Sequence, residues 1–176
     1  MAQPHGANKM SSLKQHIDSV PDFPKQGILF RDIAPLLRDK YAETVDAISD
    51  LFTDEEWNNI DVIAGIESRG FIFASGLAYK HKKGMVKIRK SGKLPNAHSK
   101  INYGLEYGDD ALEMQKGGGN ILIIDDVLAT GGTLEAAAKL CEQTNHEIAG
   151  IAVLINLTEL NDFKWNDVQL KSVIDY

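Results

Sequence analysis

The 176 residues are enough for one domain with a sizeable core, and a 43% hydrophobic and 25% charged composition is ordinary for a globular protein. No apolar run approaches the ~20 residues that span a bilayer, and the polar start MAQPHGANKM lacks the apolar core of a signal peptide. One cysteine, Cys141, excludes an intrachain disulfide, and a net charge of −6 argues against nucleic-acid binding. We expect a cytoplasmic protein with no membrane or nucleic-acid partner, a single domain over residues 1–176 and a flexible tail over 1–10.

The first fifty residues contain few regular patterns. Residues 12–20 can form a short helix, and Pro21 and Pro24 then prevent helix. A short apolar run follows at residues 28–30. Apolar side chains at helical spacing predict a helix over 41–52.

From residue 62 onward, strand and helix patterns alternate. Strands are expected over 62–66, 84–88, 121–124 and 148–157, and helices over 71–79 and 133–143. Residues 89–104 are expected to form a long loop and 105–113 a hairpin. This alternation predicts an α/β fold with a mainly parallel central sheet flanked by helices. Ligands of such folds bind at the carboxyl ends of the strands.

One segment of this acidic protein is strongly basic. No acidic residue occurs between Glu67 and Glu106. The basic residues there are Arg69, Lys80, Lys82, Lys83, Lys87, Arg89, Lys90, Lys93 and Lys100. The lysines at 80, 82 and 83 are also explained as a solvated helix end, whereas the others fall mainly in glycine-bearing segments that suit a small polyanion.

The run ILIIDDVLATGGT, residues 121–133, is the most informative. An apolar strand leads into two carboxylates, Asp125 and Asp126, and a turn of small residues then precedes a helix. Uncovered amides at a helix start bind phosphate, whereas carboxylates repel it and suit hydroxyl groups or a cation. The run therefore predicts a phosphate cradle beside a diol or metal site.

This run resembles the phosphoribosyl pyrophosphate (PRPP) motif of the type I phosphoribosyltransferases. The segments DFPKQGILFRDI (22–33), GIESRGF (65–71), IRKSGKLP (88–95) and LEYG (105–108) resemble the adenine phosphoribosyltransferase family in the same order. The resemblance implies the type I phosphoribosyltransferase fold, with a small N-terminal hood over the base site at about residues 11–35 and a mobile lid hairpin. It also implies a homodimer.

The resemblance assigns residues to each part of the substrates. For PRPP, the ribose and 5-phosphate would contact Asp125, Asp126, Ala129, Thr130, Gly131, Gly132 and Thr133. The pyrophosphate would contact Glu67, Ser68, Arg69, Arg89, Lys90 and Lys93, around a peptide that is often cis. Adenine would contact Leu29, Phe30 and Arg31, while Tyr103 and Tyr107 would belong to the lid.

The resemblance also implies a reaction. The 5-phosphoribosyl group of PRPP would pass to N9 of adenine through an oxocarbenium-like transition state, giving AMP and pyrophosphate, with Glu106 exchanging a proton with the base. Mg²⁺ would bind mainly through PRPP, with Asp125 as the candidate protein ligand.

Two alternatives stay open from the sequence. One is a phosphoribosyltransferase for an oxopurine, and the other is a non-catalytic PRPP or purine sensor on the same fold. The segment KGGGN, residues 116–120, departs from the family by its shortness and its three glycines.

Overall fold

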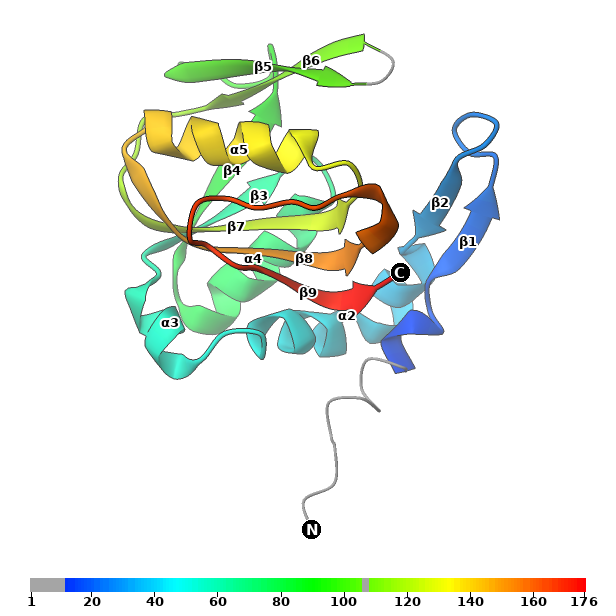
Figure 1. Cartoon of the computed structure of the whole chain (residues 1–176). Coiled ribbons are helices and arrows are strands. Elements are labelled where there is room, and N and C mark those ends of the chain that lie inside the picture. The colour runs from blue at the N-terminus through cyan, green and yellow to red at the C-terminus, as the bar shows by residue number, and fades with distance from the viewer. Residues whose placement is uncertain (1–11, 106–107) are drawn as a thin grey trace. The chain divides into compact units, whose positions relative to one another are not determined.

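The computed structural model describes residues 12–105 and 108–176 (Figure 1). The chain divides into two compact units, residues 1–50 and 51–176. The predicted hood, residues 11–35, falls in the first unit, and the predicted tail lies outside the described residues. A single domain over the whole chain stays a prediction.

The first unit contains a two-stranded sheet and a long helix. A helical turn at residues 12–14 precedes β1 (Asp18–Pro21), which pairs antiparallel with β2 (Leu29–Asp32). Helix α2 (Ala34–Ser49) follows, with a kink at Lys40.

Two helix predictions in this unit need correction. The predicted helix over 12–20 is wrong after residue 14, because residues 18–21 pair with β2 as a strand. The second helix begins at Ala34, well before the predicted residue 41, since Pro35 is favourable in a first helical turn.

In the second unit, the described residues form a seven-stranded sheet in the order β5-β6-β4-β3-β7-β8-β9. Its strands are β3 (Val62–Ile66), β4 (Gly84–Lys90), β5 (Ser99–Leu105), β6 (Gly108–Met114), β7 (Gly119–Leu128), β8 (His146–Asn156) and β9 (Leu170–Asp175). The helices are α3 (Asp54–Asn59), α4 (Gly70–His81), α5 (Gly132–Gln143) and the 3₁₀ turn η1 (Thr158–Leu160). The predicted parallel core is confirmed in β4, β3, β7, β8 and β9, while β5 and β6 run antiparallel.

The helices α4 and α5 lie on opposite faces of the sheet (Figure 1). Both follow parallel strands, but β3 connects to β4 on one side and β7 connects to β8 on the other. Because such crossovers are right-handed, opposite directions along the sheet place the two helices on opposite faces.

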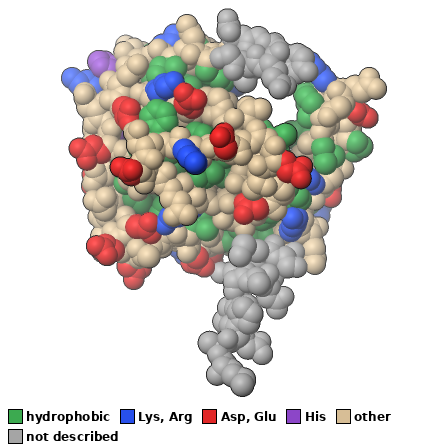
Figure 2. Space-filling view, in the orientation of Figure 1, with side chains coloured by type: hydrophobic (Ala, Val, Ile, Leu, Met, Phe, Trp, Pro, Cys, Tyr) green, Lys and Arg blue, Asp and Glu red, His purple; other side chains and the backbone are tan. Residues whose placement is uncertain are grey.

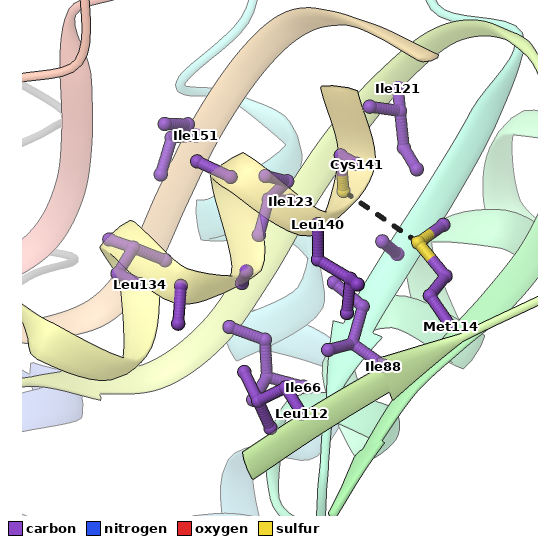
Figure 3. Packing of buried hydrophobic residues seen from close by; sticks show 14 of the residues in the cluster. Ile66, Ile88, Leu112, Met114, Ile121, Ile123, Leu134, Leu140, Cys141 and Ile151 are labelled. Atoms are coloured by element: carbon purple, nitrogen blue, oxygen red, sulfur yellow. Dashed lines mark hydrogen bonds between the residues drawn. The ribbon is translucent and has the colours of Figure 1, made fainter. Parts of the chain in front are cut away.

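The apolar face of α5 anchors one side of this core (Figure 3). Leu134, Leu140 and Cys141 of the helix lie in one cluster with isoleucines of β3, β4, β7 and β8. The Cys141 sulfur lies 4.0 Å from the sulfur of Met114, and burial raises the pKa of this thiol to about 12. Cys141 is thus a packed residue of the core.

Gly117, the first glycine of the KGGGN segment, makes room for a buried histidine. A Cβ on Gly117 would lie 2.3 Å from Cε1 of His146. The Gly118 amide donates to His146 Nε2 over 3.1 Å, and Nδ1 lies 3.0 Å from the Thr144 hydroxyl. The segment precedes β7, at the opposite end of that strand from Asp125.

Candidate active site

The site lies where the connections of the sheet diverge, between β3 and β7. These neighbours pair in parallel through Ile124, and their carboxyl ends carry Glu67 and Asp125 respectively. Such a switch point is the usual ligand position in open α/β sheets. The prediction that this strand ends at residue 124 is wrong, because β7 continues to pair with β8 as far as Leu128; only its pairing with β3 ends at Ile124.

The turn after β3 brings an arginine to the acidic pair. The Glu67–Ser68 peptide is cis, and Arg69 stands at the start of α4. Arg69 Nε lies 2.8 Å from Asp126 Oδ2. This close approach of α4 to β7 needs Gly70, where a Cβ would lie 2.8 Å from the Ile124 carbonyl oxygen.

The paired aspartates occupy an environment that disfavours their charge. Asp126 is 6% exposed, and its Oδ2, although it forms the ion pair with Arg69, makes no hydrogen bond of good geometry within the described part of the chain. Burial raises the pKa of Asp126, and burial together with the Asp126 charge raises the pKa of Asp125 well above its usual range. Asp125 Oδ1 accepts from the Asp126 amide over 2.9 Å. Acceptors thus remain for hydroxyl donors or a cation.

The predicted phosphate loop borders a cavity of about 170 Å³. Asp125, Ala129, Thr130, Gly131 and Thr133 are among its lining residues. Gly131 has φ 97°, which permits the turn into α5, and no side chain caps the first amides of that helix. Unpaired amides at a helix start, beside two hydroxyls, are suited to an anion.

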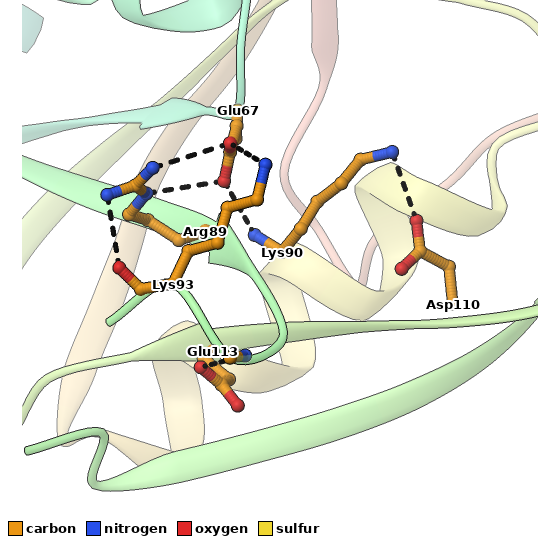
Figure 4. A network of polar contacts seen from close by, with 7 residues as sticks. Glu67, Arg89, Lys90, Lys93, Asp110 and Glu113 are labelled. Atoms are coloured by element: carbon orange, nitrogen blue, oxygen red, sulfur yellow. Dashed lines mark hydrogen bonds and ion pairs between the residues drawn. The ribbon is translucent and has the colours of Figure 1, made fainter. Parts of the chain in front are cut away.

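A buried carboxylate gathers the basic side chains (Figure 4). The carboxylate of Glu67 accepts from Arg89 Nε over 3.3 Å, from the Lys90 amide over 2.9 Å and from Lys93 Nζ over 3.2 Å. Burial alone would raise the pKa of Glu67, but these donors outweigh it and lower the pKa to about 2. Glu67 is therefore ionised, and it faces cations.

The hairpin of β5 and β6 contacts both the predicted phosphate loop and the basic side chains around Glu67. The Tyr103 hydroxyl donates to Asp110 Oδ2 over 3.3 Å and also interacts with the Thr133 side chain. Lys90 Nζ lies 3.3 Å from the same Asp110 oxygen (Figure 4). Burial is the main cause that raises the pKa of Tyr103, followed by the charge of Asp110.

The predicted adenine residues lie on β2 in the first unit. Phe30 makes an edge-to-face contact with Phe23, with ring centroids 5.1 Å apart. Arg31 donates to the Ser19 hydroxyl of β1, and Leu29 is 48% exposed. Glu106 and Tyr107 lie outside the described residues.

Sequence reasoning missed two acidic residues of β6. Asp110 contacts Lys90, and Glu113 accepts hydrogen bonds from the turn between Lys90 and Lys93. The signal in the sequence for Glu113 was one charged residue inside the otherwise apolar run of residues 111–114, which is buried in the structure.

The charges near the site are balanced rather than concentrated. Each of Arg69, Arg89, Lys90 and Lys93 lies against a carboxylate. Figure 2 likewise shows acidic and basic side chains interspersed on the face that it draws. The basic stretch of the sequence thus meets acidic partners from other strands.

The donor set fits a magnesium ion that arrives with its substrate. Among the described residues, no three His, Cys, Asp or Glu side chains form a metal cluster. Asp125 and Asp126 supply carboxylate oxygens only. Mg²⁺ commonly binds through one or two carboxylates plus substrate phosphates, so these residues suit it without a protein cage.

A parallel sheet with a carboxylate pair beside an uncapped helix start, at its switch point, is the architecture of a phosphoribosyltransferase. The phosphoribosyl transferase domain family matches residues 38–171, and the chain belongs to this family.

Its relatives are adenine phosphoribosyltransferases. The enzyme of Hydrogenovibrio crunogenus is 55% identical over 169 residues, which cover 96% of this chain and 98% of the relative. Among solved structures, the enzyme of Thermoanaerobacter pseudethanolicus is 38% identical, with a TM-score of 0.87 over 95% of this chain and 99% of the other. The Saccharomyces cerevisiae enzyme, in complex with an imino-altritol bisphosphate and adenine, is also 38% identical, with a TM-score of 0.81 over 88% and 92%.

No helix in the described part of the chain has the length and hydrophobicity that crossing a membrane requires.

Proposed function

We propose that this chain is an adenine phosphoribosyltransferase of purine salvage. It transfers the 5-phosphoribosyl group of PRPP to N9 of adenine and releases pyrophosphate and AMP. The observation that carries the proposal is the carboxylate pair Asp125–Asp126 beside the open cavity at the start of α5. Names and complexes of the relatives support adenine as the base.

The geometry supports a division of PRPP between neighbouring groups. The first amides of α5, with the Thr130 and Thr133 hydroxyls, bind the 5-phosphate, since they present hydrogen-bond donors at a helix start. Asp125 and Asp126 accept from the ribose hydroxyls. Pyrophosphate binds Ser68, Arg69, Arg89, Lys90 and Lys93.

Glu67 has a different role from these pyrophosphate ligands. Its ionised carboxylate would repel a diphosphate, and it already accepts from Arg89 and Lys93. We propose that Glu67 orients these two cations and contributes its backbone to the pyrophosphate turn.

The chemistry at the ribose needs few protein groups. Departure of pyrophosphate builds positive charge on the ribose, and adenine N9 then forms the new bond to the anomeric carbon. Glu106 exchanges a proton with the base, which makes N9 more nucleophilic. Tyr103 and Tyr107, with the hairpin, exclude the water that would otherwise hydrolyse PRPP.

Mg²⁺, when bound, neutralises charge on the pyrophosphate. Asp125 is the side chain that would hold it, together with oxygens of PRPP. Leu29, Phe30 and Arg31 bind adenine, with the ring of Phe30 stacked on the base and the backbone of Leu29 at its edge. We propose a cytoplasmic homodimer, as the family resemblance implies.

An assay of purified protein with PRPP and Mg²⁺ tests this function. Adenine, hypoxanthine, guanine and xanthine are offered separately, and nucleotide products are separated by chromatography. AMP from adenine alone is the expected result. Product from an oxopurine would overturn the assignment of residues 29–31. PRPP binding without product from any base would instead indicate a sensor.

A further inference from the structure

The turn that carries Lys90 and Lys93 is held by a carboxylate without a role in the reaction described above. Glu113 of β6 is 8% exposed. Its Oε1 accepts from the Ser91 hydroxyl over 3.0 Å, and its Oε2 accepts from the Gly92 amide over 3.0 Å (Figure 4). Both oxygens thus contact the loop that joins Lys90 to Lys93.

This loop is a tight turn with a defined shape. The Lys93 amide donates to the Lys90 carbonyl over 3.3 Å, which closes four residues. Gly92, the third residue, has φ 80°, as a type II turn requires at that position. The Ser91 amide donates to the Ala111 carbonyl over 2.8 Å, so β6 holds the turn through backbone and side chain together.

Two carboxylates fix the turn from different elements. Glu67, in the turn after β3, holds the Lys90 amide and the side chains of Arg89 and Lys93, while Glu113 of β6 holds the middle of the turn. The side chains of Lys90 and Lys93 remain 52% and 54% exposed. A fixed backbone therefore presents accessible lysine side chains.

Burying the charged carboxylate of Glu113 costs desolvation free energy, which hydrogen bonds to both of its oxygens offset. A glutamine could fill the same volume, and the Ser91 hydroxyl could accept from its NH₂, but the Gly92 amide would then donate to a neutral oxygen in place of a charged one. Only the carboxylate offers charged acceptors to both groups.

We propose that Glu113 is a positioning residue for pyrophosphate recognition. It holds the Ser91–Gly92 turn so that Arg89, Lys90 and Lys93 meet the diphosphate of PRPP together. Because Glu113 stands on β6, it also ties this turn to the lid hairpin, so the cations and the lid keep one geometry. The proposal rests on the proposed function, since it assigns pyrophosphate to these cations.

Calorimetry on Glu113→Gln tests it with ligands that differ in the pyrophosphate. We expect the Kd values of PRPP and of pyrophosphate to rise by roughly 10-fold, the factor that one hydrogen bond to a charged group supports. The Kd of AMP, which has the 5-phosphate and ribose but no pyrophosphate, is expected to stay unchanged. Glu147→Gln is the matched control, because Glu147 is exposed at the other end of the sheet.

Equal weakening of AMP and PRPP in Glu113→Gln would reduce Glu113 to a structural role and overturn the proposal, as would unchanged binding of all three ligands. If that variant does not fold, Ser91→Ala removes one of the two hydrogen bonds of Glu113 and is expected to raise the Kd of PRPP while leaving the Kd of AMP unchanged. An equal rise in both Kd values would again overturn the proposal. Failure of the wild type to bind PRPP would overturn the proposed function itself.

Discussion

At the residue scale, the aspartate pair is arranged for a ligand at the expense of folding. Burial, and for Asp125 the neighbouring charge, raises the pKa values above the usual range. A raised carboxyl pKa means that the folded state binds protons more readily than the unfolded state. The contribution of this pair to the free energy of unfolding is therefore largest below the ordinary aspartate pKa of ~3.9. It is lost as the pH rises through the pKa values of the two aspartates in the folded state.

Asp125→Asn should consequently stabilise the protein at pH 8. We expect a gain of about 1 kcal/mol, or roughly 2–4 °C in Tm for a chain of this length, that disappears near pH 4. Thermal melts at both pH values measure it. A lower Tm at pH 8 would contradict the raised pKa.

The double variant Asp125→Asn with Asp126→Asn should lose PRPP binding. The ribose hydroxyls would lose their charged acceptors, and Arg69 would lose its ion pair with Asp126. Calorimetry with PRPP is the measurement, with a thermal melt to verify folding. Tight PRPP binding by a folded double variant would remove these residues from the site.

Glu67 has the opposite pH dependence. Its pKa of about 2 lies below the ordinary value, so its contribution to stability is complete above pH ~4.5 and is lost as pH falls toward 2. Glu67→Gln should lower the free energy of unfolding by about 1–3 kcal/mol at pH 7, and this difference should shrink below pH 4.5. Denaturant titrations at several pH values test it; a constant difference would contradict the shift.

At the element scale, the sequence predicted the second unit better than the first. Long apolar runs and helical spacing are local signals, and they identify β3, α4, α5 and β8 nearly to their ends, and the apolar middle of β7. Residues 18–21 and 99–105 form strands because they pair with distant or facing segments, which local spacing does not encode.

The candidate site was likewise predicted from local patterns but not from contacts between distant elements. Its residue types were predictable from motifs, since carboxylates before a Thr-Gly-Gly-Thr turn are a local pattern. The contacts that organise them, such as Arg69 with Asp126 and Glu113 with Gly92, join residues on separate elements. Their partners depend on strand order, which the sequence alone did not supply.

The glycine segment before β7 gives an element-scale prediction. Gly117→Ala should destabilise the fold by about 1–3 kcal/mol, because its Cβ would overlap the ring of His146. Gly118→Ala is the matched control, since its Cβ would meet only the Asn145 oxygen at 3.5 Å. Chemical denaturation measures both, and the Kd of PRPP is expected to stay constant. Equal stability of the two variants would contradict the role of His146.

At the scale of the whole molecule, catalysis should require Mg²⁺ while folding should not. The described residues contain no three-ligand cluster, and we expect the ion to arrive with PRPP rather than as part of the structure. Excess EDTA is expected to stop turnover and to leave the Tm of the ligand-free protein unchanged. Full activity in EDTA would refute the metal requirement, and a lowered Tm would indicate a structural ion.

The pairing of every cation near the site with a carboxylate has a consequence for selectivity inside a cell. At the proposed pyrophosphate site, an incoming anion would have to displace Glu67, Asp110 and Asp126 from donors that these carboxylates already engage. We expect a lone inorganic phosphate to reach too few of these donors to displace the carboxylates. A diphosphate held in place by its sugar engages several at once, so the protein can discriminate PRPP from the abundant simple phosphates around it.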